Sequence, residues 1–288
     1  MSKSHPQWYN MSKSHPQLDL ETKKFLTDFK SIIDSLEVPM LLIGAQARIL
    51  IFDSQYKVQG RATKDWDVAV KLDNWERYNL LISIMTTGQN PLFKTTRVIH
   101  KFIHIETELE VDVIPFGDIG KPKEEINWPD GNQMNILGLE EAFTNTEIII
   151  IDNLEIRVAD IDAFIALKLL AWNNRRENKD LKDIITVLLK SPNEEDQDRV
   201  YDEFVDEIIE GRFEVDEAAI IFIGRNIQNK FKSETFNKVK EIVDIILEQD
   251  TYISQCMPQF LDNQEWDETF DKIVKRFESL QYGLTKEL

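Results

Sequence analysis

The sequence predicts an α+β fold in which a mixed β-sheet part is followed by a bundle of helices. In residues 38–158, short apolar runs such as Met40–Ile43 alternate with stretches whose apolar residues have helical spacing. After Val158 the spacing is helical almost to the last residue. With 288 residues, 42% of them hydrophobic, the chain can bury one large core or two linked ones. We therefore predict an α/β domain over residues 18–158 and a helical domain over residues 159–288.

The elements of the first part follow from the period of the apolar residues. Helices are expected at 21–36 and 75–85, and a strand at 40–43 turns at Gly44 into a helix from Ala45 to about Tyr56. Residues 97–106 and 109–115 suit adjacent antiparallel strands. The Gly- and Pro-rich stretch 117–131 is expected to be a loop flanking the site, and residues 148–158 a hairpin turning at Asp152 and Asn153. Later helices are expected near 160–175, 180–190, 196–210, 215–230, 233–249 and 265–281.

Composition limits the partners of the protein. A net charge of −18, from 34 basic and 52 acidic residues, opposes sequence-independent binding to nucleic acid or anionic membranes. Without an apolar run near the length of about 20 residues that spans a bilayer, and without a signal-peptide core, we expect a cytoplasmic protein with no membrane partner. The single cysteine, Cys256, excludes an intramolecular disulfide. The heptapeptide MSKSHPQ occurs at 1–7 and again at 11–17, so we interpret residues 1–17 as a disordered tag or duplicated start.

Three aspartates in two expected strands form the candidate site. Asp65 and Asp67, in the segment 61–70, are two residues apart, so they share one face with Cα atoms roughly 6.5 Å apart. Asp112 lies between two valines, and a neighbouring strand lies only about 4.8 Å away. Carboxylates that close repel one another, and a hard cation such as Mg²⁺ or Mn²⁺ removes the repulsion. The pattern predicts a divalent-metal site, although the pair alone would fit a strand end or turn equally well.

Two further features predict an anion beside these aspartates. Gly44 allows the backbone to approach a ligand closely, and the N–H groups at a helix start attract phosphate. Lys168 lies in a helix with apolar residues on nearly every side, so its side chain either snorkels to the surface or points at an anion. Basic residues follow it within two turns, with two acidic residues on one face, and a solvated, salt-bridged helix is the alternative explanation. These residues are Arg175, Arg176, Lys179, Lys182, Asp180 and Asp183.

The order of the motifs IGAQAR, GRATKDWDVAV and EVDVIPF resembles the nucleotidyltransferase superfamily of DNA polymerase β-like fold. Residues 159–184, ADIDAFIALKLLAWNNRRENKDLKDI, are similar to the downstream helix pair of the AbiEii/AbiGii-type toxin nucleotidyltransferases within it. The resemblance covers about residues 38–190. Many superfamily members have Gly-Ser or Gly-Gly where this chain has Gly44-Ala45, so a serine hydroxyl that would hold a phosphate is missing.

The resemblance implies an Mg²⁺-dependent nucleotidyltransferase with a role in toxin–antitoxin systems or phage defence. Asp65 and Asp67 would hold Mg²⁺ on the triphosphate, and Asp112 would help to bind a second ion and activate the incoming hydroxyl, with pyrophosphate as the leaving group. The implied partners are an NTP, an RNA (tRNA 3′ end) or protein acceptor, and a cognate antitoxin. The expected catalytic residues are Asp65, Asp67, Asp112 and Lys168. The expected NTP-binding residues are Gly44, Ala45, Arg48, Arg61, Lys64, Lys168, Asp180 and Asp183.

An RNA acceptor needs a local basic path on so acidic a protein. A candidate path near the site, joined by the cluster around Arg175, consists of Lys57, Arg61, Lys64, Lys94, Arg97 and Lys101. Two other functions use parts of the same pattern. Ala45 and the acidic helical half favour a nucleotide-binding or protein-interaction module without catalysis, and a carboxylate-metal nuclease would leave Gly44 and Lys168 without a use.

Overall fold

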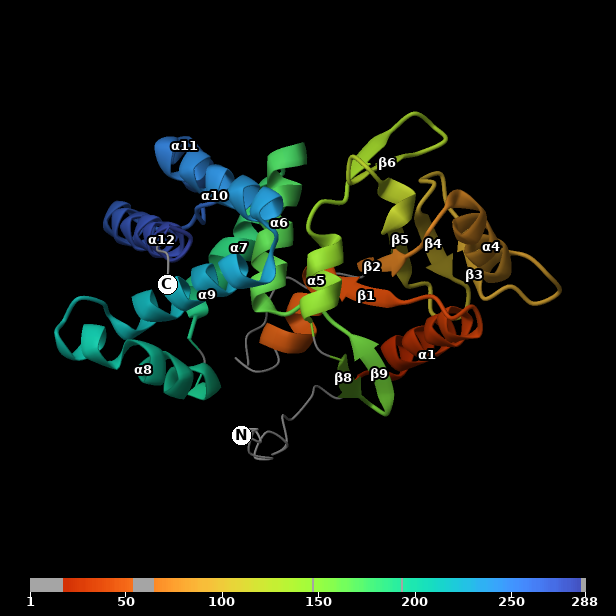
Figure 1. The fold of residues 1–288 in the computed structure, drawn as a ribbon, viewed down its shortest axis with the longest axis horizontal. Coiled ribbons are helices and arrows are strands. Elements are labelled where there is room, and N and C mark those ends of the chain that lie inside the picture. Colours follow the sequence, from red (N-terminus) through yellow and green to blue (C-terminus); the bar gives the residue numbers. More distant parts are fainter. Residues whose placement is uncertain (1–17, 54–64, 147, 193, 286–288) are drawn as a thin grey trace, which may run out of the picture.

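The computed structural model describes residues 18–53, 65–146, 148–192 and 194–285. A five-stranded mixed sheet with helices packed against it is followed by a helical region (Figure 1), which confirms the predicted fold class. The repeated heptapeptide lies outside the described residues, and the division into two domains at residue 158 stays a prediction. None of the helices in the described ranges combines the length and apolar character that a membrane span requires.

The sheet and its helices come from the first part of the chain, where side-chain caps fix two helix starts. The Asp19 side chain accepts a hydrogen bond from Thr22 N at the start of the first helix, and the Asn74 side chain does the same for Arg77 N. The elements are α1 (Leu20–Ser35), β1 (Met40–Ile43), α2 (Gly44–Arg48), a turn of π-helix (Ile49–Asp53), β2 (Asp65–Lys71), α4 (Trp75–Thr86), β3 (Phe93–Thr95), β4 (Lys101–His104), β5 (Glu110–Phe116), a 3₁₀ turn (Asp118–Gly120), β6 (Glu125–Asn127), β7 (Gln133–Asn135), α5 (Leu139–Asn145), β8 (Ile148–Ile151) and β9 (Leu154–Arg157).

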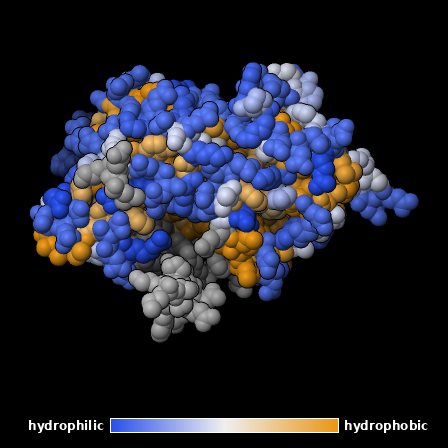
Figure 2. Space-filling model, in the orientation of Figure 1, coloured by the Kyte–Doolittle hydropathy of each residue, from blue (hydrophilic) through white to orange (hydrophobic). Residues whose placement is uncertain are grey.

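The helical region follows at once, and its helices lie together on one side of the sheet (Figure 1). Asp160 caps its first helix by accepting from Ala163 N, and Asp262 and Glu265 form a capping box on its last. The face of the molecule in Figure 2 is largely hydrophilic, as expected for a chain with 30% charged residues. The helices are α6 (Ile161–Arg175), α7 (Asn178–Lys190), α8 (Glu194–Ile209), α9 (Val215–Lys230), α10 (Ser233–Glu248), α11 (Asp250–Ser254) and α12 (Asn263–Gly283).

The strand order of the main sheet is β1-β2-β5-β4-β3. The central pair, β2 and β5, is parallel, and every other pair in this sheet is antiparallel. The expected antiparallel pairing of the segments around 101 and 112 is therefore confirmed as β4 with β5. The parallel register brings β2, which carries Asp65 and Asp67, directly beside β5, which carries Asp112.

The two faces of the sheet have opposite character because side chains alternate along each strand. Trp66 and Val68, both buried, point toward α1, where the rings of Phe25 and Trp66 lie 5.3 Å apart. On this face the Tyr78 hydroxyl of α4 donates to the Val113 carbonyl at 3.1 Å. The aspartates between these residues therefore point to the other face, as the sequence predicted.

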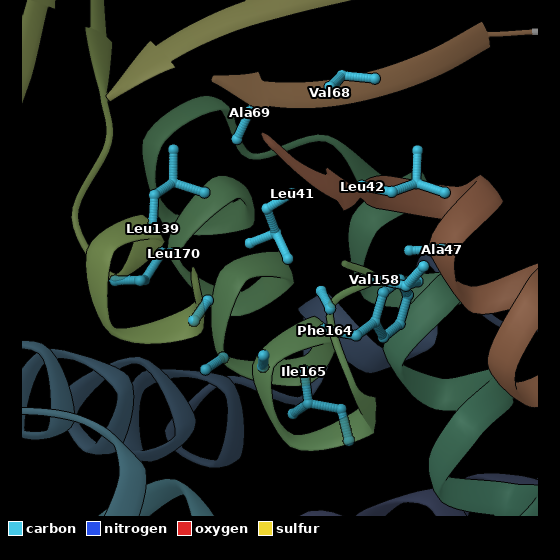
Figure 3. Close-up of a cluster of buried hydrophobic side chains, with 14 of the residues drawn as sticks. Leu41, Leu42, Ala47, Val68, Ala69, Leu139, Val158, Phe164, Ile165 and Leu170 are labelled. Atoms are coloured by element: carbon cyan, nitrogen blue, oxygen red, sulfur yellow. The ribbon is translucent and has the colours of Figure 1, made fainter. Parts of the chain in front are cut away.

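That other face becomes apolar farther along the strands, where it packs against the helical region. Figure 3 shows Leu41 of β1 and Ala69 of β2 close to Leu139 of α5 and Leu170 of α6. The hairpin β8–β9 turns at two residues with positive φ, as predicted, and its end joins β1, since Ala159 N donates to the Leu42 carbonyl at 2.9 Å. The apolar contacts anchor α6 beside the row of aspartates.

Several boundaries differ from the predicted ones. The stretch 117–131 is not a plain loop, because residues 125–127 form β6, which pairs with β7. The expected helix from 45 begins at Gly44 and changes to π-helix at Ile49, and its predicted end near Tyr56 falls outside the described residues. The strand β3 and the helices α5 and α11 were not predicted. All are short, and three to seven residues contain too few repeats for periodicity to reveal them.

Candidate functional site

A row of carboxylates lies across the two central strands. Asp67 of β2 and Asp112 of β5 are direct partners in the parallel register, and Asp65 lies one pleat away beside Glu110. Partnered residues and residues two apart project from the same face of a sheet. Asp65, Asp67 and Asp112 are therefore adjacent on one face, as expected from the two sequence patterns.

Gly44 lies against Asp67, because Ile43 at the end of β1 is the register partner of Asp67. The backbone of Gly44 has φ +72°, and a Cβ atom built on it would lie 2.8 Å from Cγ of Asp67. Only glycine adopts this conformation freely and leaves that space. In the structure the space that the glycine leaves is taken by the carboxylate of Asp67. The predicted approach of a ligand to Gly44 stays a prediction.

The carboxylates are held in surroundings that disfavour their charge. Burial, helped by the negative charge of Asp112, raises the pKa of Asp67 to about 6, although Lys168 and Arg175 oppose the shift. Burial also raises the pKa of Asp112, against the attraction of Lys101. A positive charge near Asp67 and Asp112 would therefore stabilise their ionised forms.

Lys101 of β4 supplies one such charge from the strand next to β5, where it is the register partner of Asp112. Its Nζ lies 3.5 Å from Asp65 Oδ1, 3.5 Å from Asp112 Oδ1 and 3.0 Å from Glu110 Oε2. Burial alone would lower the pKa of Lys101, but the hydrogen bond to Glu110 and the charges of Asp112 and Asp65 raise it to about 12. The ammonium is therefore charged at any ordinary pH.

A second charged cluster lies on the helices that face the sheet. Lys168 Nζ of α6 is 3.0 Å from Asp180 Oδ1 and 2.9 Å from Asp183 Oδ2 of α7. Arg175 makes a bidentate pair with Asp180 at 2.7 and 2.6 Å, and although burial raises the pKa of Asp180, these partners lower it overall. Lys168 is buried and ion-paired, so its side chain does not snorkel to the surface. Its predicted contact with an anion stays a prediction.

A cavity of about 340 Å³ lies between Asp67 and this cluster. Asp67 and Gly44 lie on one wall and Lys168 and Arg175 on another, with the β7 segment beside them. This volume is in the range of small-molecule sites in proteins. The polar residues of the lining not yet mentioned are Gln133, Asn135 and Asn174, and the apolar ones are Ile43, Ile114, Met134, Ile136, Leu137, Leu139, Ala159, Phe164, Leu167, Leu170 and Ala171.

Sequence reasoning missed the β7 segment and Asn174 as parts of the cavity wall. The flanking loop was expected to end at Gly131, but the lining residues begin two positions later, on the second strand of the β6–β7 hairpin. Pro129, Asp130 and Gly131 are turn residues, and they are the signal that would have suggested a hairpin rather than a loop.

Four of the other predicted NTP-binding residues, Ala45, Arg48, Asp180 and Asp183, do not line the cavity. Arg48 of α2 is fully buried, and Ala45 is partly buried. Arg61 and Lys64 lie outside the described residues, so their proposed roles stay predictions. Of the predicted basic path, Lys94 pairs with Glu108 at 2.9 Å, and Lys101 is paired as described above.

The carboxylate row fits a hard divalent cation by the chemistry of its atoms. Carboxylate oxygens are the ligands that Mg²⁺ and Mn²⁺ prefer, and Asp112 Oδ1 is buried without a hydrogen-bond partner. In the part of the chain that the structure describes, however, no three His, Cys, Asp or Glu side chains are gathered into a group that could hold a metal ion. The aspartates are neighbours without converging on one point, and their role as metal ligands stays a prediction.

Comparisons with known proteins found similarity only among solved structures. No protein-family model matches the chain. No curated protein matches it either. An antigenic nucleotidyltransferase-like protein from Paracoccidioides brasiliensis is similar at 15% identity, over 60% of this chain and 78% of that one, with a TM-score of 0.40. JHP933 from Helicobacter pylori is similar at 12% identity, over 93% and 95% of the two chains, with a TM-score of 0.36.

The antibiotic-resistance factor ANT(2″)-Ia is similar at 12% identity, over 55% of this chain and 75% of that one, with a TM-score of 0.32. At these identities the likeness concerns the fold alone, and at these TM-scores it carries no argument about activity. None of the three is described as an AbiEii- or AbiGii-type protein.

Proposed function

We propose that this protein is an Mg²⁺-dependent nucleotidyltransferase that moves a nucleoside monophosphate from an NTP to a hydroxyl group. The observation that carries the proposal is the cavity between the sheet and α6, with Asp67 on one wall and Lys168 and Arg175 on another. Two basic side chains opposite a carboxylate suit a triphosphate that is bound together with a cation.

The lining of the cavity also suits the rest of an NTP. Beyond the charged end the wall is apolar, with residues such as Phe164 and Leu170 that would cover the faces of a base. Gln133, Asn135 and Asn174 are amides that can pair with a polar base edge or with ribose hydroxyls. The NTP is therefore proposed to lie with its phosphates toward Asp67 and its base toward α6 and β7.

Asp65, Asp67 and Asp112 are the residues that would hold Mg²⁺ or Mn²⁺. Bound there, the metal would stabilise charge on the attacking and leaving oxygens of an in-line displacement. Asp112 would accept the proton of the acceptor hydroxyl, whose oxygen forms a bond to the α-phosphorus while the bond to pyrophosphate breaks. Lys168 and Arg175 would neutralise the phosphates, which requires Lys168 to share or exchange its contacts with Asp180 and Asp183.

The acceptor is proposed to be RNA, with the 3′ end of tRNA as the first candidate, or a protein side chain. The net charge of −18 restricts RNA to a local contact, and the ion pairs of Lys94 and Lys101 leave little free positive charge on β3 and β4. The proposed setting is an AbiEii/AbiGii-like toxin or phage-defence system, with a cognate antitoxin as partner. This setting rests on the motif resemblance alone.

Label transfer tests the proposal. The protein is incubated with each α-³²P-labelled NTP, Mg²⁺ and either total RNA or cell lysate, and the labelled acceptor is then identified. Transfer should occur with the wild type and fall at least about 100-fold with Asp67→Asn. Asp34→Asn, a change of the same kind at an exposed position on α1, should leave transfer unchanged. Equal transfer by Asp67→Asn and the wild type would contradict the proposed site.

A second candidate is a nucleotide-binding or interaction module without catalysis. Three observations favour it: Ala45 in place of a hydroxyl or glycine, the pairing of Lys168 with two carboxylates, and the ungathered aspartates. Calorimetry with each NTP separates the two candidates. Binding without label transfer or pyrophosphate release would favour the module, and pyrophosphate release would exclude it.

A further inference from the structure

Lys101 occupies a special position in the carboxylate row. Its ammonium is within 3.5 Å of oxygens on two different strands, Asp65 Oδ1 on β2 and Asp112 Oδ1 on β5. These are two of the three side chains proposed as metal ligands. The lysine is thus a cation already located between the carboxylates that a divalent ion would need.

The contacts of Lys101 with the two aspartates are of the kind that can be exchanged. Charge-assisted hydrogen bonds between nitrogen and oxygen are about 2.7–2.9 Å long, so 3.5 Å is an ion pair rather than a good hydrogen bond. Asp112 Oδ1 accordingly remains without a hydrogen-bond partner. Mg²⁺ would approach such oxygens to about 2.0–2.1 Å and would be held far more strongly.

Glu110 provides the place to which the ammonium can retreat. Its Oε2 accepts a hydrogen bond from Lys101 at 3.0 Å, the shortest of the three contacts, and its side chain is more exposed than that of Asp112. An ammonium has three donors on a flexible stem, so it can keep this bond and turn away from the aspartates.

We propose that Lys101 is a tethered counter-ion that occupies the position between Asp65 and Asp112 and is displaced toward Glu110 when a divalent cation binds. The inference rests on the proposed function, since it takes the aspartates as the metal ligands. Lys101 is then a positioning residue: it keeps the carboxylates together in the metal-free protein and weakens binding of the ion that replaces it.

Direct binding of Mn²⁺ in the absence of nucleotide tests the inference, with free Mn²⁺ measured by electron paramagnetic resonance. Lys101→Met removes the competing charge and should tighten Mn²⁺ binding by about tenfold or more, which corresponds to about 1.4 kcal/mol. Lys101→Arg keeps the charge and should stay within about threefold of the wild type. Lys94→Met removes a lysine of the neighbouring strand that pairs with Glu108, and it should also stay within about threefold.

Thermal unfolding adds a second readout. In EDTA, Lys101→Met should melt below the wild type, because its carboxylates lose their counter-ion, and saturating Mn²⁺ should remove the difference. Lys101→Gln, which keeps a polar side chain, repeats both measurements if Lys101→Met does not fold. The inference is supported if Mn²⁺ binds more tightly to Lys101→Met, or to Lys101→Gln, and to no other variant.

Two results would overturn it in distinguishable ways. If Lys101→Met and Lys101→Gln bind Mn²⁺ no more tightly than the wild type, or if Lys94→Met gains as much, the tethered counter-ion is wrong. Intact label transfer by the wild type would then leave the proposed function standing. If neither the wild type nor any variant binds Mn²⁺, with or without NTP, the inference and the metal-dependent function fail together.

Discussion

Replacing Gly44 by alanine should lower the free energy of unfolding by about 2–5 kcal/mol, because two separate costs meet at this position. The first is the backbone: φ is +72°, and an L-residue in the left-handed region costs roughly 1–2 kcal/mol. The second is space, because the new Cβ would lie 2.8 Å from Cγ and 3.0 Å from Cβ of Asp67. Forcing a side chain to move away from such an overlap costs typically about 1–3 kcal/mol.

Gly211 is the matched control for the backbone cost. Its φ is +70°, nearly that of Gly44, but a Cβ atom there would meet nothing within 4 Å. Gly211→Ala should therefore cost only about 1–2 kcal/mol. Urea unfolding followed by circular dichroism gives both values under one set of conditions.

A double-mutant cycle then isolates the overlap with Asp67. In an Asp67→Ala background the carboxyl group that the new Cβ would meet is gone and only the contact with Cβ of residue 67, at 3.0 Å, remains. Gly44→Ala should therefore cost less than in the wild type, close to the cost of Gly211→Ala. The difference between the two backgrounds measures the steric coupling of Gly44 and Asp67. If Gly44→Ala costs the same in both backgrounds, or no more than Gly211→Ala in the wild type, the close packing of the glycine on Asp67 is refuted.

Two further changes test the charges of the site. In EDTA, Asp67→Asn should stabilise the protein at pH 8 by up to about 3 kcal/mol and much less at pH 4, because the folded carboxyl has a pKa of about 6 against an ordinary 3.8. Between these two values the folded wild type binds more protons than the unfolded chain, so its unfolding free energy should fall as pH rises. Urea titrations of both proteins from pH 4 to 8 check this, and parallel profiles would contradict it. Lys168→Met should cost about 3 kcal/mol, since it leaves Asp183 and part of Asp180 uncompensated in a buried cluster, whereas Lys179→Met, on an exposed pair with Glu177, should cost about 1 kcal/mol or less. Equal unfolding free energies for the two lysine variants would refute the buried pairing.

Much of the fold was predictable because its signals are local. The alternation around Trp66 and Val68 identified both the strand and its buried face, and the Asp152-Asn153 pair identified a hairpin turn. Each signal lies within a few residues along the chain and depends on the period of a strand or the φ preference of a turn residue. Strands of three residues, such as β3 and β7, contain too little of this alternation to be recognised, and they were missed.

The sequence alone determined which residues could make a site: three aspartates on strand faces, a glycine at a strand end, and a lysine in an apolar helix. Only the tertiary structure decided what each one contacts. Asp67 meets Gly44 through the pairing of β1 with β2, Lys101 meets Asp65 and Asp112 through the register of β4 on β5, and Lys168 meets Asp180 through the packing of α6 on α7. These contacts depend on strand register and helix packing, which are set by the burial of whole faces and not by any residue's neighbours in sequence.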